Sequence, residues 1–381
     1  MRGKARRRLV WFGRANPDRR PSSKVCRADL RAKVLDSRAA HLAPSLSSEH
    51  PYPNCRCNSQ LSPVTQEQQH VFLAPISNQG TKQSTAPRDN MSDMMVPPTF
   101  CQRVNDLAEP APLLLGSAWN FTVVFLDTVF RRGELLAPIL RMSQIRAEGF
   151  SRFWIKFSGA RDPASSIPAE RVGSSALMPA LLSTASGVIL DIGPGTGTQM
   201  PLLTSPDIKA IYGAEPTDGL HTDLLAKIDS CGLSSKYQIL HCGAEPQSLI
   251  PALDKAGFKE LGSGVFDTII CVRVLCSVPR PEETIQGLYR LLKPGGKLLI
   301  AEHVVNPWCT RQGSIVGRLA QLFYTLLGWP FFMGSCDMNR DTGKMLRKAA
   351  ERDGGWASDT LKTSFAWGPM PYVSGILVKR S

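Results

Sequence analysis

The chain has 381 residues, 43% of them hydrophobic, which leaves room for a sizeable core in one large domain or two modest ones. Its formal net charge of +13 suggests a nucleic-acid or anionic-membrane ligand until the charge is located. Residues 1–90 hold 16 Lys and Arg against six Asp and Glu, so the rest of the chain carries only +3. A nearly neutral remainder lacks the basic surface that nucleic-acid binding requires, so we expect no nucleic-acid partner.

Residues 1–90 form a basic leader that we expect to be disordered, because they are rich in Ser, Pro, Gln and Asn with only scattered apolar residues. Two interpretations stay open. The leader could be an organelle transit segment, although its early aspartates disfavour this, or an extension ahead of a natural start at Met91. Cys55 and Cys57 lack a second ligand pair at metal spacing, so we expect no metal site.

Residues 91–180 are predicted to form an N-terminal helical segment. Within it, residues 110–126 contain no charge, but seventeen residues that include Pro, Gly, Ser and Asn are at the lower limit for a membrane span. We therefore expect a helix that packs on the domain or lies at a membrane surface. The scattered cysteines favour a reducing, intracellular compartment. We expect the cytoplasm or the cytoplasmic face of an internal membrane, either the endoplasmic reticulum or a lipid droplet, rather than the mitochondrion.

Residues 181–381 alternate apolar strand candidates with segments of helical spacing. Buried strands that alternate with helices predict a parallel sheet covered on both faces, an α/β Rossmann-like, doubly wound fold. The end of the chain reads as an antiparallel pair around the Gly368-Pro369 turn. The five parallel strand candidates are GVILDIG (187–193), KAIYGAEP (209–216), YQILHCGAEP (237–246), FDTIICVRVLCSV (266–278) and KLLIAEHV (297–304).

A glycine loop follows the first of these strands, where a parallel sheet binds its ligand. Gly193, Gly195 and Gly197 would let the ligand approach the backbone closely. The dinucleotide fingerprint requires a further glycine where this chain has Thr198, so the spacing argues against that ligand class. Asp191, at the strand end, is a poor neighbour for a pyrophosphate but a good one for a ligand with sulfonium and ammonium groups.

Acidic residues also follow the second and third strands. Glu215 lies 24 residues after Asp191 and could accept hydrogen bonds from both ribose hydroxyls of an adenosine. Gly243, Ala244 and Glu245 follow the third strand, where they could flank an adenine ring. Three such features at consecutive strand ends predict an S-adenosylmethionine site.

These residues resemble the first motif and the ribose-binding acid of class I S-adenosylmethionine-dependent methyltransferases, and residues 292–296 (LKPGG) resemble their turn before the fifth strand. The resemblance covers about residues 180–381 and implies S-adenosyl-L-methionine as cofactor. It also implies a seven-stranded sheet with a reversed last strand. Neighbours of these motifs complete the predicted cofactor-binding set, namely Pro194, Pro216 and Arg273.

Further segments look like a methyltransferase-like group that includes membrane-associated alkyl-thiol S-methyltransferases. The matching segments are CVRVLCSV (271–278), EHV (302–304), CDMNRDT (336–342) and PYVSGILVK (371–379). Ser335, Arg273 and Tyr372 stand where that group has a glycine, an apolar residue and a histidine. These departures leave the fold unaffected but bear on the acceptor.

Methyl transfer is an in-line displacement, so the protein chiefly aligns the reactants and excludes water. A thiol acceptor ionises with little help, whereas an alcohol or phenol requires a base. The candidate catalytic residues are His303, read as lying just past the fifth strand, and Cys276, read as lying at the end of the fourth. A helical cap at about 305–345 contains an uncharged, aromatic-rich stretch at 319–336, which favours a small apolar acceptor. O- or N-methylation and a non-catalytic interaction module stay as alternatives, with peripheral membrane contact a further expectation.

Overall fold

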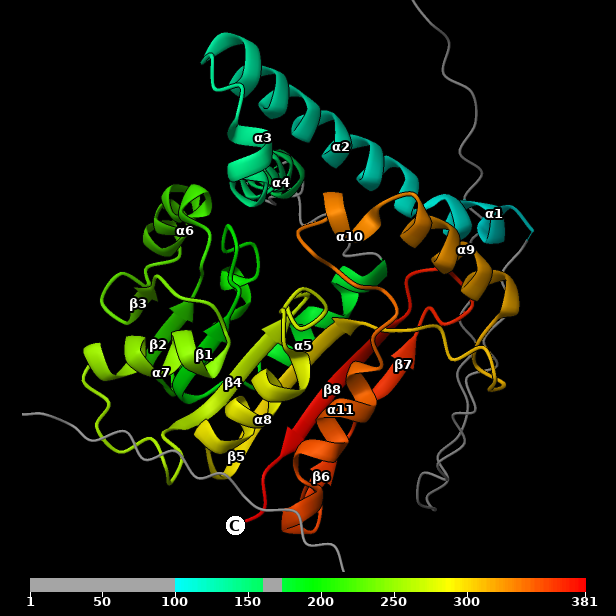
Figure 1. Cartoon of the computed structure of the whole chain (residues 1–381). Helices are drawn as coiled ribbons and strands as arrows, with labels where there is room; N and C mark the ends of the chain where they lie inside the picture. The colour runs from blue at the N-terminus through cyan, green and yellow to red at the C-terminus, as the bar shows by residue number, and fades with distance from the viewer. Residues whose placement is uncertain (1–99, 160–172) are drawn as a thin grey trace, which may run out of the picture. The chain divides into compact units, whose positions relative to one another are not determined.

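The computed structural model describes residues 100–159 and 173–381, which belong to a compact unit that spans Asn90–Ser381. The predicted disordered leader at 1–90, with Cys55 and Cys57, lies outside the described residues. Figure 1 shows a central sheet with helices on both faces and a further group of helices beyond the carboxyl ends of its parallel strands.

One mixed sheet organises the domain, with strand order β3-β2-β1-β4-β5-β8-β6 and with β7 also paired to β8. Strands β1 to β5 run parallel, and β8 runs antiparallel to β5. This confirms the predicted Rossmann-like architecture with a reversed last strand. The strands are β1 Gly187–Ile192, β2 Ile208–Ala214, β3 Tyr237–Leu240, β4 Phe266–Val272, β5 Leu292–His303, β6 Ser358–Asp359, β7 Lys362–Ser364 and β8 Tyr372–Val378.

The sheet has eight strands rather than the seven expected, because its outer edge is broken in two. β6 pairs with Leu377 and Val378, and β7 pairs with residues 372–374 of the same strand β8. Between them, the Thr360 carbonyl lies 2.6 Å from the position that a Cβ would take on Gly375, where φ is +151°. The seventh position of the sheet is therefore occupied by two short strands that are separated by this close approach.

Alternating strand residues face two separate cores, which explains why the strands read as continuous apolar runs. Leu190 and Leu298 pack with α7, α8 and α11, whereas Ile189 and Leu299 pack with α5 and α6 on the opposite face. The helices that cover the sheet are α5 Met178–Leu182, α6 Asp218–Ser230, α7 Pro246–Lys255, α8 Pro281–Leu291 and α11 Thr342–Ala349.

A second group of helices lies beyond the carboxyl ends of β1 and β4 (Figure 1). The predicted helix at 110–126 is α2, which continues through a π-helical turn at Asp127–Arg131 and packs against α4. The predicted cap contributes α9 and α10, and the Ser117 hydroxyl of α2 donates a hydrogen bond to the Phe332 carbonyl of α10. The bounds are α1 Phe100–Ala108, α2 Pro110–Leu126, α3 Ala137–Leu140, α4 Met142–Gly159, α9 Ile315–Leu326 and α10 Trp329–Phe332.

Candidate active site

A cavity of about 550 Å³ lies between the strand ends and the helices beyond them. Every residue predicted to bind the cofactor or to act in catalysis lines this cavity. The set comprises Asp191, Gly193, Pro194, Gly195, Gly197, Glu215, Pro216, Gly243, Ala244, Glu245, Arg273, Cys276 and His303.

The glycine loop after β1 depends on glycine at three positions. Gly193, Gly195 and Gly197 have φ values of +62°, +61° and +76°, a region that residues with a Cβ rarely adopt. Space is also short, because a Cβ on Gly193 would lie 2.6 Å from Val274 Cγ2 and one on Gly195 would lie 3.0 Å from Trp154 Nε1. The loop therefore presents bare backbone to the cavity.

Glu215 joins the glycine loop to the end of β2. Its Oε2 accepts a hydrogen bond of 3.0 Å from the Gly195 amide, and its Oε1 accepts one of 2.9 Å from the Thr217 amide. The side chain is 4% exposed and lines the cavity. A carboxylate has about four acceptor sites, so it can hold the loop and still accept from a ribose hydroxyl.

Asp191 is held from β3. The Tyr237 hydroxyl donates a hydrogen bond of 3.0 Å to Asp191 Oδ2. Burial raises the pKa of Asp191 to about 6, with a smaller lowering effect from this hydrogen bond and a further rise from the charge of Glu215. A buried carboxylate beside a second one favours a cationic ligand, which fits the sulfonium and ammonium groups of S-adenosylmethionine.

The residues after β3 form the third side of the cofactor end. The Gly243 amide donates to Ser248 Oγ at 3.0 Å, and Glu245 is the residue that precedes α7. The Glu245 carboxylate folds back over Gly243, where a Cβ would collide with it. A side chain at position 243 would therefore displace the Glu245 carboxylate, and Ala244 and Glu245 line the cavity beside it.

The position predicted for Cys276 at the end of the fourth strand is wrong. β4 ends at Val272, and Arg273 has a φ of +57° that turns the chain away from the sheet. The Arg273 guanidinium donates to the Tyr372 hydroxyl at 3.1 Å and to Ser174 Oγ at 2.9 Å. Cys276 therefore lies in a turn after the strand.

Glu302 holds this turn, a relationship that the sequence did not indicate. Its buried carboxylate accepts hydrogen bonds from the amides of Val274 at 2.9 Å, Leu275 at 3.0 Å and Cys276 at 3.4 Å. Burial raises the pKa of Glu302, although these hydrogen bonds favour its charged form. The turn is thus fixed on the last residues of β5.

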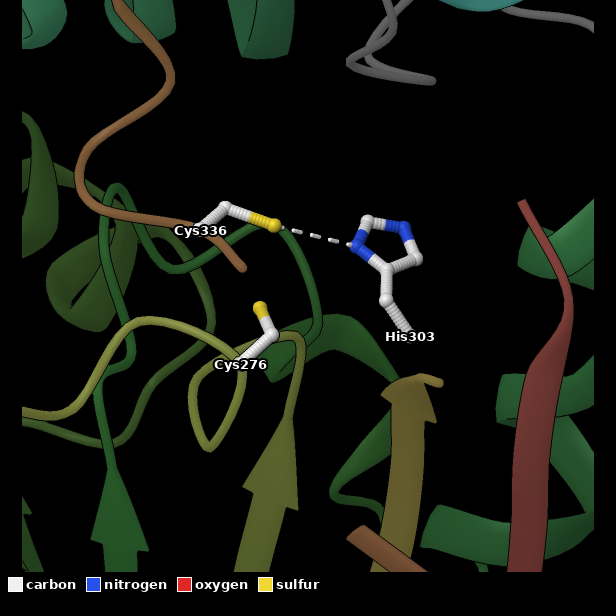
Figure 2. Close-up of side chains that lie close together, drawn as sticks. All are labelled: Cys276, His303 and Cys336. Carbon is white, nitrogen blue, oxygen red and sulfur yellow. Dashed lines mark hydrogen bonds between the residues drawn. The ribbon is translucent and has the colours of Figure 1, made fainter. Parts of the chain in front are cut away.

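Cys276, His303 and Cys336 lie together at the other end of the cavity (Figure 2). Cys336 Sγ is 3.6 Å from His303 Nδ1, and the His303 ring packs edge-on against Tyr372 at 4.5 Å. The hydrogen bond with Cys336 and burial raise the pKa of the Cys276 thiol well above its usual range. Burial lowers the pKa of His303, but Tyr372 and Cys276 outweigh this and raise it to about 9. Of these three, only Cys276 and His303 were predicted from the sequence.

Aromatic side chains of α4 cover the glycine loop and were also missed. Phe150, Trp154 and Phe157 line the cavity, and Thr196 Oγ1 of the loop donates to Ser158 Oγ at 2.9 Å. The sequence does contain a signal for this helix, because aromatic residues at 150, 153, 154 and 157 follow helical spacing.

Comparison with known proteins identifies the family that the sequence resembles. Residues 166–354 match the family model of a methyltransferase domain. Among curated proteins, the thiol S-methyltransferase TMT1B of Rattus norvegicus is 35% identical over 126 residues, which is 32% of this chain and 47% of the relative. The Homo sapiens TMT1B is 35% identical over 91 residues, or 24% of this chain and 35% of the relative.

The matches to these relatives thus span less than half of their length. Among solved structures, an O-methyltransferase family protein from Burkholderia thailandensis is 14% identical, covers 73% of this chain and 72% of its own, and has a TM-score of 0.40. Together, the methyltransferase domain at 166–354 and the curated relatives support a class I S-adenosylmethionine-dependent methyltransferase.

Proposed function

We propose that the chain transfers the methyl group of S-adenosylmethionine to a small apolar thiol. One observation carries this proposal: a single cavity has two carboxylates and a glycine loop at one end, and apolar side chains line much of its remaining wall. Phe150, Phe157 and Met333 contribute to that wall. A cavity of about 550 Å³ has the size of a small-molecule site, and two relatives are named thiol S-methyltransferases.

The cofactor supplies a methyl group that is already activated by its sulfonium charge. Asp191 and Glu215 would hold the cationic and ribose ends, and the glycine loop would bring its amides to the same molecule. Trp154 and the other aromatic residues of α4 would exclude water from the reacting atoms. With alignment and desolvation supplied, a thiol requires no strong base to react.

An oxygen acceptor is the second candidate, because His303 lies in the cavity and one of its nitrogens is available. His303 Nε2 is buried and has no hydrogen-bond partner among the residues that the structure describes. An unpaired buried nitrogen of this kind fits a hydroxyl group of a bound acceptor. A non-catalytic interaction module receives no comparable support, since Asp191 and Glu215 both line the cavity. These two carboxylates do not distinguish N-methylation from the other acceptor classes, which the product analysis separates.

The deciding experiment offers the purified full chain an alkyl thiol, a phenol and an amine of matched size, each with isotopically labelled S-adenosylmethionine. Mass spectrometry of the products should show the labelled methyl group on sulfur. Cys309→Ser is the matched control, because Cys309 is an exposed thiol that could itself accept the label. Labelled phenol or amine in place of thioether would overturn the thiol assignment.

Peripheral membrane contact is a separate proposal that rests on exposed apolar side chains. α3 and the turn before it expose Leu136, Ile139 and Leu140, while α9 exposes Leu319 and Leu326 and buries Gln321. The helical stretch Arg103–Arg131 is long and apolar enough to cross a membrane, but α2 within it packs one face against α4. We propose that these helices lie on a lipid surface, from which an apolar acceptor would enter the cavity.

A further inference from the structure

We infer that Cys276, His303 and Cys336 form a zinc site whose open fourth position receives the acceptor. The sequence alone led us to expect no metal, because Cys55 and Cys57 have no second ligand pair at metal spacing. The folded chain brings two thiols and one imidazole within 4.8 Å of one another. Ion binding is argued from this geometry, and its role in catalysis rests on the proposed function.

The distance between Cys336 Sγ and His303 Nδ1 fits a tetrahedral zinc ion, and Cys276 Sγ lies within 4.8 Å of both atoms. With Zn–S near 2.3 Å and Zn–N near 2.0 Å, the sulfur-to-nitrogen edge of a tetrahedron is about 3.6 Å. Cys336 Sγ and His303 Nδ1 are 3.6 Å apart, and Figure 2 shows both directed toward the space above Cys276. The distance between Cys336 Sγ and His303 Nδ1 is therefore that of a weak hydrogen bond and also the distance expected between two ligands of one zinc ion.

The three ligands are fixed by the backbone of separate elements. The Cys276 amide donates to Glu302, the residue before His303, and the Cys276 carbonyl accepts a hydrogen bond of 2.9 Å from the Asp337 amide. These two contacts hold the turn after β4, the end of β5 and the segment after α10 together. Preorganised ligands bind a metal with little further ordering of the chain.

Chemistry and burial select the ion. Two thiolates and an imidazole are the ligand set of zinc sites that keep an open position. Cys276, Cys336 and His303 are 2%, 6% and 9% exposed, and the buried Glu302 carboxylate below them favours a cation. All three ligands line the cavity, so the fourth position opens toward the acceptor.

Bound zinc would activate the thiol. An acceptor R–SH would bind through sulfur and release its proton to solvent, since zinc lowers the pKa of a coordinated thiol. A sulfur lone pair would then form the new carbon–sulfur bond as the bond from the methyl carbon to the sulfonium breaks. The electron pair of the broken bond stays on the leaving S-adenosylhomocysteine. The thioether product carries no charge, binds zinc weakly and leaves.

The test measures zinc in the full chain after dialysis against metal-free buffer. We expect about one zinc ion per chain, and a loss of at least tenfold in bound zinc for Cys276→Ser and for Cys336→Ser. The matched control Cys309→Ser, an exposed cysteine, should keep the zinc. Unchanged S-adenosylmethionine affinity in the two site variants shows that they have folded.

A spectroscopic measurement on the unmodified chain keeps the inference testable if a variant fails to fold. Cobalt added to the metal-free protein should give a thiolate-to-metal charge-transfer band. Absence of this band, a disulfide between Cys276 and Cys336, or equal zinc in the double serine variant would each overturn the zinc site. If the zinc-free protein still methylates thiols, the proposed function is supported and the role of zinc in catalysis is refuted. Zinc binding without thioether product would leave the site standing and refute the function.

Discussion

The Tyr237 side chain reaches across β2 and donates a hydrogen bond to Asp191, two strands away in the sheet. Gly213 of β2 lies directly beneath it, and a Cβ there would collide with the Tyr237 hydroxyl. A tyrosine on β3, a glycine on β2 and an aspartate on β1 therefore act as one unit. This unit sets the charge at the cofactor end of the cavity.

Tyr237→Phe should weaken S-adenosylmethionine binding at neutral pH by about fivefold. The change removes a hydrogen bond to a charged group, worth on the order of 1–2 kcal/mol, and leaves Asp191 more easily protonated. Isothermal titration calorimetry measures the affinity. Tyr212→Phe on β2 is the control, because the Tyr212 ring packs against Phe258 on the apolar side of the sheet. Equal affinities for both variants would contradict the role of Tyr237.

Gly213→Ala should cause the same loss of cofactor affinity while Tyr237 and Asp191 themselves stay unchanged. The added methyl group would displace the Tyr237 hydroxyl from Asp191. We expect weaker cofactor binding and a lower free energy of unfolding, by about 1–3 kcal/mol. Gly232→Ala is less suitable as a control because φ is positive there, so Gly262→Ala, which has open space around it, serves instead. Full cofactor affinity in Gly213→Ala would show that Tyr237 can adjust.

The raised pKa of Asp191 predicts a pH dependence of stability. Since the folded value of about 6 exceeds the ordinary 3.8, the folded state holds this proton more tightly than the unfolded state. The resulting stabilisation is complete below pH 3.8 and is lost as pH rises through about 6. Urea unfolding of the cofactor-free protein and of Asp191→Asn should therefore diverge over this window, by on the order of 3 kcal/mol. A difference that stays constant with pH would refute the assignment.

Glu215→Gln tests the contact between the glycine loop and β2. Glutamine keeps the shape, but its amide NH₂ must replace one oxygen that now accepts from Gly195 or Thr217. Two donors would then face each other, so we expect at least a tenfold loss of S-adenosylmethionine affinity. Glu260→Gln, on an exposed loop, is the matched control for the loss of a negative charge. An unchanged S-adenosylmethionine affinity in Glu215→Gln would show that Glu215 holds the loop but does not contribute to cofactor binding.

The parallel sheet and the glycine loop could be predicted because both follow from local patterns. Apolar runs that alternate with helices predict a parallel sheet, and such a sheet places its ligand at the carboxyl ends of its strands. The end of the fourth strand was not predicted, because apolar residues continue on both sides of Arg273 within 266–278. The turn at Arg273 depends on hydrogen bonds to Glu302, which lies 29 residues further along the chain.

The rest of the site depends on residues that become neighbours only in the fold. Tyr237 and Asp191 are 46 residues apart, and Cys336 and His303 are 33 apart. These separations do not match the short spacings of a helix, a strand or a known motif. The sequence therefore does not indicate that the residues of either pair are in contact. The aromatic residues of α4 differ in this respect. Their helical spacing is visible at 150–157, and only their contact with the glycine loop could not be predicted.

The exposed apolar residues around α3 predict binding to a lipid surface that does not depend on charge. Neutral phosphatidylcholine vesicles exclude the contribution of the basic residues 1–90, which would bind anionic lipid by themselves. The full chain should float with these vesicles in a density gradient. The double variant Leu136→Asp/Ile139→Asp should reduce the bound fraction severalfold, because these side chains are 64% and 79% exposed and insertion of a carboxylate into lipid is costly.

Leu225→Asp on α6 supplies the control for this experiment, since Leu225 is 52% exposed on a helix that covers the sheet. Its vesicle binding should equal that of the unmodified chain. Equal flotation of all three proteins would show that α3 does not contact lipid. A chain that fails to float at all would leave the cavity to acceptors that arrive from water, so the apolar wall would then select the acceptor by shape alone.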